Sequence, residues 1–247
     1  MHHLCAFSAS NVQTVEVDTP ALTDGIMSIQ NNHFFLQRDM PILFAAVASA
    51  TQSRARLSSP TLRQITTPFI RPISTAASFG VPQRVQDFNT NYPVAKAQEE
   101  LSLLSVQLGA GAERVTGIVG LGFQMTPPPA GPAYTLRGTS TTAAVANAWS
   151  PIAMTWQDTL PAGVYAVVGG EHVSAGGMAF RLILEQAFYR PGGLSIVANG
   201  NYSDPIFHNA HLGEWGRFTA NAFPNVEVLA VSADAAHDVY LELVKVG

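Results

Sequence analysis

Short apolar or alternating runs, separated by Gly, Pro, Asn and Ser, recur along the whole chain and predict β-strands almost throughout. In the first half the predicted strands are residues 12–17, 25–30, 33–37, 42–48, 62–66, 101–108 and 114–121. In the second half they are residues 134–139, 152–156, 164–169, 179–185, 194–198, 226–232 and 239–246. Each half therefore carries close to eight short strands.

Helix signals are few. Residues 94–104, with Lys96, Glu99 and Glu100, and the Ala-rich residues 141–149 are each expected to form a short helix. Two irregular stretches, residues 74–93 and 199–216, fall late in each half and carry aromatic residues that we expect to be exposed. These aromatics are Phe88, Tyr92, Phe207 and Trp215. Loops of this length usually have a role, such as contact with a partner.

Similar short segments recur in the same order on both sides of a Pro-rich joint at residues 126–132. They are Leu36-Gln37 and Trp156-Gln157, Met40-Pro41 and Leu160-Pro161, Phe44–Val47 and Tyr165–Val168, Arg56-Leu57 and Arg181-Leu182, Phe69–Pro72 and Phe188–Pro191, and Ala112–Val115 and Ala236–Val239. Their separations, between 119 and 125 residues, are close to half the chain. We interpret them as a duplication; the alternative is chance similarity between two β-patterns. Two all-β halves of this size fit eight-stranded jelly rolls better than immunoglobulin-type sandwiches, whose turns are tighter.

Composition indicates a protein with unusually little charge. Of 247 residues, 12% are charged and 47% are hydrophobic, and the net charge is −4. The charged share is about half of the usual one. Either a large Ala-rich core or neighbouring subunits that cover much of the surface would account for it, and we favour the second. The first basic residue is Arg38, so the sequence shows no basic arm for nucleic acid. No signal peptide or transmembrane segment is expected, and the single Cys5 excludes an internal disulfide.

Catalytic and metal motifs are incomplete. Residues 160–165 resemble the Pro-x-Gly turn of a cupin, but Ala166 stands where that motif requires His. His208, His211 and Glu214 follow one another at three-residue intervals, yet Pro205, Asn209 and Gly213 predict a loop rather than a helical zinc site. We expect solvated or interface side chains there, and no catalytic, cofactor-binding or metal residue in the chain.

The remaining candidates are acidic, glycine-rich or basic. The carboxylates that could form a glycosidase pair are Asp158, Glu171, Asp204, Glu214 and Glu227. The glycines at 109–111 predict a hairpin turn, and those at 117–122 a strand in close backbone packing rather than a phosphate site. Arg recurs in both halves, as Arg56 and Arg181 and as Arg71 and Arg190. Each pair would either fix an interface or cap strand ends in its barrel.

The duplicated β-halves, the Pro-rich joint, the late loops and the missing catalytic signatures resemble the double jelly-roll major capsid proteins of tailless icosahedral viruses. The resemblance implies a first jelly roll at residues 1–125, a joint at 126–132 and a second jelly roll at 133–247. It implies homotrimers, with six barrels forming a pseudo-hexagonal block that tiles a shell. Partners would be neighbouring trimers, vertex or minor capsid proteins and, in many such shells, an internal membrane. The protein would be made in the host cytoplasm and reside in the virion, without a cofactor or sequence-specific nucleic acid binding.

Two other interpretations stay open on sequence alone. One is a carbohydrate-binding or hydrolytic double β-sandwich protein, which would need a cluster of exposed aromatics beside an acidic pair. The other is a single jelly-roll coat protein with an added domain, a class that commonly uses the basic arm missing here.

Overall fold

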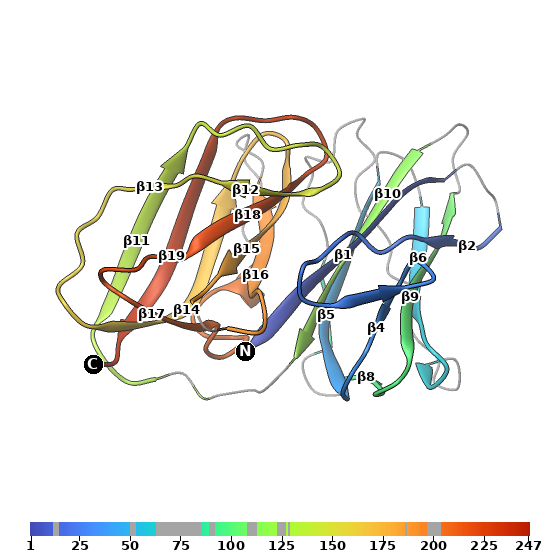
Figure 1. Ribbon diagram of the computed structural model, residues 1–247, viewed down its shortest axis with the longest axis horizontal. Coiled ribbons are helices and arrows are strands. Elements are labelled where there is room, and N and C mark those ends of the chain that lie inside the picture. Colours follow the sequence, from blue (N-terminus) through green and yellow to red (C-terminus); the bar gives the residue numbers. More distant parts are fainter. Residues whose placement is uncertain are drawn as a thin grey trace. The chain divides into compact units, whose positions relative to one another are not determined.

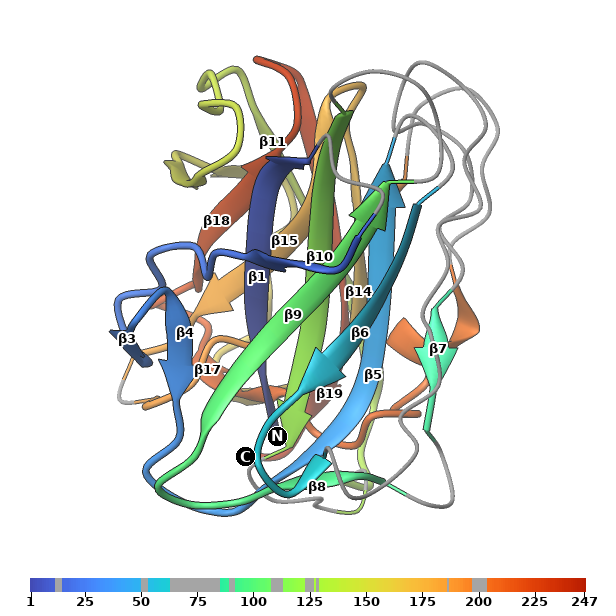
Figure 2. The same cartoon turned by 90° about the vertical axis from the view of Figure 1, so that its right-hand side faces the viewer.

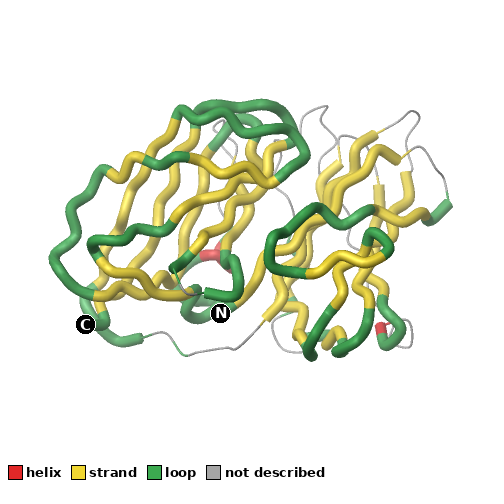
Figure 3. The backbone as a smooth tube through the Cα atoms, viewed as in Figure 1, coloured by secondary structure: helices red, strands yellow, loops and turns green. Residues whose placement is uncertain are grey.

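The computed structural model describes residues 1–11, 15–49, 53–62, 85–88, 92–107, 113–122, 127, 129–185, 187–196 and 204–247. The chain divides into two compact units. One is Cys5–Gly122, and the other is Phe123–Gly247 together with Met1–Leu4. Strands dominate both, and the short 3₁₀ helix η2 (Pro205–Phe207) is marked in red in Figure 3. No helix among the described residues is long and apolar enough to cross a membrane.

The C-terminal unit has eight principal strands in jelly-roll order. They are β11 (Ala133–Ser140), β12 (Trp149–Ile152), β14 (Val164–Val173), β15 (Gly177–Ile183), β16 (Gly192–Ile196), β17 (Gly216–Thr219), β18 (Asn225–Ala230) and β19 (His237–Lys245), with the short β13 (Thr155–Trp156) beside β11. One sheet runs β11-β19-β14-β17 and the other β12-β18-β15-β16 (Figure 1). Counted along the chain these orders are 1-8-3-6 and 2-7-4-5, the arrangement of two Greek keys. We call this unit the C-terminal barrel.

The described strands of the N-terminal unit follow the same order, with no described counterpart of β16. Its strands are β1 (His2–Asn11), β2 (Val17–Thr19), β3 (Ser28–Gln30), β4 (His33–Phe35), β5 (Met40–Ser49), β6 (Ser53–Ser58), β7 (Gln86–Asp87), β8 (Val94–Ala95), β9 (Glu100–Gln107) and β10 (Glu113–Gly122). One sheet runs β1-β10-β5-β7, and in the other β9 pairs with β2, β4 and β6. In Figure 2, β9 and β6 cross in front of β10 and β5. We call this unit the N-terminal barrel.

The repeated segments of the sequence lie on corresponding strands. Phe44–Val47 belongs to β5 and Tyr165–Val168 to β14, the third principal strand of each barrel. Arg56 lies on β6 and Arg181 on β15, the fourth strand. The two-jelly-roll fold and its repeat are thus confirmed for the described strands, while Arg71 lies outside the described residues.

Alternating burial produces each core. Along β19 the residues His237, Val239, Leu241 and Leu243 are buried and their neighbours are less so, as expected for a strand with one face on the core. In β10, glycine lets neighbouring side chains reach the backbone: a methyl group at Gly120 would overlap the ring of Phe44. The interpretation of residues 117–122 as a closely packed strand is therefore confirmed.

Both predicted helices are wrong. Residues 94–104 form β8, a turn and the first half of β9. β8 pairs with β5, and β9 pairs with β2 and β6. Residues 141–148 are irregular, with isolated bridges at Ala144 and Ala146, and Trp149 begins β12. Tertiary pairing overrides weak local propensity in both places.

The division of the chain falls after Gly122, and the first four residues are counted with the C-terminal barrel. There the Leu4 amide donates to the carbonyl of Arg190 at 2.9 Å, and the buried ring of His2 lies edge-on to Trp215. The boundary thus lies inside β1.

Candidate functional site

The structure does not gather His208, His211 and Glu214 into one site. His208 Nδ1 lies 2.7 Å from a carboxylate oxygen of Glu242 and its Nε2 lies 3.9 Å from Glu171. His211 is exposed. The buried Glu214 accepts two hydrogen bonds from Arg217, at 2.9 and 3.0 Å. The predicted loop character is confirmed, and the absence of a metal site stays a prediction.

Glu242 holds the loop that follows η2. One oxygen contacts His208, and the other accepts the Asn209 amide at 2.7 Å. Asn209 and Ala210 both have left-handed backbone angles, with φ of 52° and 59°, which costs about 1 kcal/mol at a residue such as Ala. The carboxylate on β19 therefore fixes a turn that the chain alone would not favour.

Each carboxylate considered for a glycosidase pair has donors or cationic neighbours of its own. Asp158 accepts the Arg137 amide at 2.7 Å, and Asp204 accepts the Ile206 amide at the start of η2. Glu227 is bound by Arg181 and Arg190, both at 2.7 Å. These contacts explain the acidic residues as structural, and they leave the enzyme question untested.

Arg181 is a buried cation with well-defined contacts. Its side chain is 1% exposed, its Nε donates to Glu227, and its guanidinium carbon lies 4.1 Å from the centre of the Trp149 ring. Arg56, on the corresponding strand of the other barrel, makes a two-pronged ion pair with Glu16, but its side chain is 32% exposed. Arg56 and Arg181 each pair with a glutamate of their own barrel from inside a strand rather than from its end, and both the strand-capping and the interface interpretation of the arginines stay predictions.

The structure also reveals a buried polar network, which we call the histidine relay: Ser195, His172, His237 and the carbonyl of Thr142. His172 Nδ1 lies 2.7 Å from Ser195 Oγ, and His172 Nε2 lies 3.1 Å from His237 Nδ1. His237 Nε2 lies 3.1 Å from the Thr142 carbonyl oxygen and 3.2 Å from that of Asp234. The two imidazoles are stacked, with centroids 5.3 Å apart. The relay joins β14, β16, β19 and the segment after β11.

The acceptors at one end fix the tautomers of both rings. Two carbonyl oxygens accept from His237 Nε2, so this nitrogen carries the hydrogen and His237 Nδ1 is left as an acceptor. His172 Nε2 must then donate to His237, and His172 Nδ1 accepts from the Ser195 hydroxyl. With both rings neutral, every hydrogen bond of the relay is therefore made.

Burial is the main cause of the low proton affinity of His172. The ring is fully buried, and burial lowers the pKa of His172 to about 3, with a smaller contribution from His237 and an opposing one from Asp234. A serine bound to a histidine has the connectivity of an activated nucleophile, but a base this weak is poorly suited to remove the Ser195 proton near neutral pH. The geometry favours a structural role.

Asp234 closes a turn beside the relay. Its carboxylate accepts from the Ser174 hydroxyl at 2.5 Å and from the amides of Gly176 and Ala236 at 2.9 and 3.1 Å. Burial would raise the pKa of Asp234, but these hydrogen bonds outweigh it and lower the pKa to about 2. The charged carboxylate is therefore committed to its own turn.

The N-terminal barrel carries a histidine of the opposite kind. His33 on β4 lies between two carboxylates, with Nε2 at 2.6 Å from Asp18 of β2 and Nδ1 at 2.8 Å from Glu100 of β9. Burial would lower the pKa of His33, but the hydrogen bonds to Glu100 and Asp18 outweigh it and raise the pKa. A ring with a carboxylate at each nitrogen makes both hydrogen bonds as the charged imidazolium. We call His33 with Asp18 and Glu100 the His33 staple.

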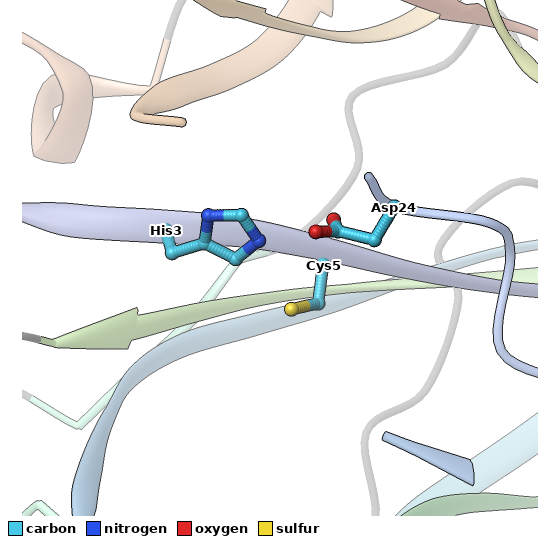
Figure 4. A group of neighbouring side chains, drawn as sticks. All are labelled: His3, Cys5 and Asp24. Carbon is cyan, nitrogen blue, oxygen red and sulfur yellow. The ribbon is translucent and has the colours of Figure 1, made fainter. Parts of the chain in front are cut away.

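Figure 4 draws His3, Cys5 and Asp24 as sticks. His3 and Cys5 are two residues apart on β1 and so point to one face of that strand. Asp24 accepts the amides of Ile26 and Met27 at 3.1 and 2.9 Å and shapes the turn after Ala21. The boundary between the units separates His3 from the other two, and we assign no metal site to them.

The predicted exposure of late-loop aromatics is wrong for two residues. Phe207 and Trp215 are buried in the C-terminal barrel, because the loop that carries them folds back over β14 and β16. Phe88 and Tyr92 are partly buried. Phe188, at 84% exposed, is an aromatic that sequence reasoning did not single out.

Comparison with known proteins gives little sequence information. No family model matches the chain, and no curated protein matches it. Among solved structures, the chain is similar to the major capsid protein P2 from bacteriophage PM2, at 8% identity over 100% of this chain and 98% of that one. The TM-score is 0.24, which is too low for this likeness to support an argument about function.

Proposed function

We propose that this chain is the major capsid protein of an icosahedral virus shell, built from homotrimers. The observation that carries the proposal is the presence of two jelly rolls with one strand order in a single chain of 247 residues. Three copies of such a chain supply six similar barrels, enough for a pseudo-hexagonal block. The protein would then reside in the virion, with neighbouring trimers and vertex or minor capsid proteins as partners.

The surface and the polar contacts support a structural role. With 12% charged residues, the chain has little charge to keep an isolated subunit soluble. Large apolar side chains are exposed on both units, including Val15 in one and Val145 and Phe188 in the other, each above 60%. Apolar exposure suits wide contacts of the obligate type. The ionisable groups considered for catalysis make contacts within the C-terminal barrel that suit a structural role.

The mass of the purified protein in solution tests the proposal. We expect light scattering after size exclusion, and native mass spectrometry, to give three times 26.3 kDa, about 79 kDa, at micromolar concentration. Phe188→Ser should shift the distribution toward smaller species if this side chain lies in a contact, whereas Thr135→Ser, a mild change at another exposed site, should not. A monodisperse 26.3 kDa species at every concentration would refute the trimer.

A further inference from the structure

The histidine relay lies where the two sheets of the C-terminal barrel join. β14 belongs to one sheet and β16 to the other, and within the described residues they pair in parallel through two residue pairs, His172 with Ser195 and Val173 with Ile196. The relay adds side-chain bonds at this short junction, from Ser195 on β16 through His172 on β14 to His237 on β19. The side-chain bonds therefore tie strands that the backbone holds weakly.

An extra proton on the relay would add a charge to a buried site. The 3.1 Å bond between the rings can be kept whichever ring carries the proton, because the Ser195 hydroxyl can turn and accept from His172 Nδ1. Since His172 is fully buried and His237 is 2% exposed, water is poorly placed to solvate that charge.

A proton on His172 keeps its hydrogen bonds but adds a buried charge. The Ser195 hydroxyl can turn and accept from His172 Nδ1, so the cost is the desolvation of the cation. The groups that face His172 are His237 from β19, the Ser195 hydroxyl from β16, the Phe180 ring from β15 and, farther away, the Asp234 carboxylate. Asp234, which is bound to Ser174 and two amides and stays charged, is a nearby anion whose attraction opposes the effect of burial on His172 but is the smaller of the two.

We propose that the histidine relay is an acid-sensitive lock, which holds β14 to β16 at their short junction only while the buried His172 ring is neutral. Acid would favour the state in which the junction is open and the rings are solvated. The inference concerns the C-terminal barrel by itself and does not depend on the capsid proposal.

Hydrogen–deuterium exchange of the full-length protein tests the lock. In the open state His172 should have an ordinary pKa near 6.5, so opening from pH 7 to pH 5 should rise about 25-fold for one histidine. We expect this rise, after correction for intrinsic exchange, in peptides that cover β14 and β16. A peptide from β10 in the N-terminal barrel serves as the internal control and should change less than threefold.

Variants and spectroscopy complete the test. The double variant His172→Gln/His237→Gln should lose most of the pH dependence of opening, whereas His211→Gln, at an exposed histidine of the same barrel, should keep the 25-fold rise. If the double variant does not fold, ¹⁵N spectra of histidine-labelled wild type decide, since the folded His172 should stay neutral with hydrogen on Nε2 down to pH 5. A wild-type rise below threefold, or a charged His172 at pH 6, would overturn the lock.

Discussion

Replacing Arg181 by methionine should destabilise the C-terminal barrel strongly, while the same change at Arg56 should barely affect the N-terminal barrel. Both arginines lie on the fourth principal strand and both pair with a glutamate at 2.8 Å or less. They differ in burial, with 1% exposure for the Arg181 side chain against 32% for that of Arg56. The comparison isolates the effect of burial on an ion pair.

The magnitude depends on what each change leaves behind. Breaking a buried ion pair from one side costs about 3–5 kcal/mol, because the remaining charge is left without its partner. Glu227 retains Arg190 at 2.7 Å, which places the Arg181→Met loss near the lower end, at about 3 kcal/mol. Methionine still covers the Trp149 ring, so most of the packing is kept. An exposed pair such as Arg56–Glu16 contributes about 0–1 kcal/mol.

Tryptophan fluorescence during urea unfolding measures the C-terminal barrel separately. All three tryptophans of the chain, Trp149, Trp156 and Trp215, lie in this barrel, so their transition should shift in Arg181→Met and stay in place in Arg56→Met. Far-UV circular dichroism at the same protein concentration follows both barrels, since any association would add to the apparent stability. Equal losses for the two variants, or an Arg181→Met loss below about 1 kcal/mol, would refute the reasoning.

Two further changes probe the N-terminal barrel. Gly120→Ala should destabilise it by about 1–3 kcal/mol, because the added methyl meets the Phe44 ring, and circular dichroism melting should show the loss; an unchanged melt would mean that the ring has room to move. His33→Gln should cost about 1 kcal/mol near pH 6, and the cost should shrink as pH rises through the raised pKa of His33, because the staple is present below the ordinary pKa and is lost when the ring becomes neutral. Hydrogen–deuterium exchange of a peptide that covers β3 and β4 measures this loss of stability. A loss that grows from pH 6 to pH 9 would contradict the staple.

Sequence reasoning succeeded where alternation and turn residues carry the fold. The long inner strands β5, β10, β14 and β19 were all predicted, because their apolar residues must face a core. β1, β6, β7, β8 and β17 were missed. β1 begins with two histidines and mixes small polar residues with apolar ones, and β6 and β17 carry Arg within short polar runs, so their pairing partners rather than their composition make them strands.

The histidine relay illustrates what a single sequence hides. His237 could have been assigned to the core, since it begins the alternation of β19. His172 gives no such signal, because β14 is buried on both faces over most of its length. That His172 meets both Ser195 and His237 depends on the register of β14 against β16 and β19, a long-range property that local pattern does not specify.

The two barrels therefore share topology but not polar chemistry, and the difference gives them opposite responses to acid. In the N-terminal barrel the His33 staple is strongest when its ring is charged. In the C-terminal barrel, burial favours the neutral form of the His172 ring in the relay. Strand order is maintained by inward apolar residues at many positions, so single polar residues between strands are free to differ from one barrel to the other. Mild acid should then loosen the C-terminal barrel of each subunit while the N-terminal barrel is held. In the proposed shell, half of the barrels would be loosened and the subunit fold would stay in place.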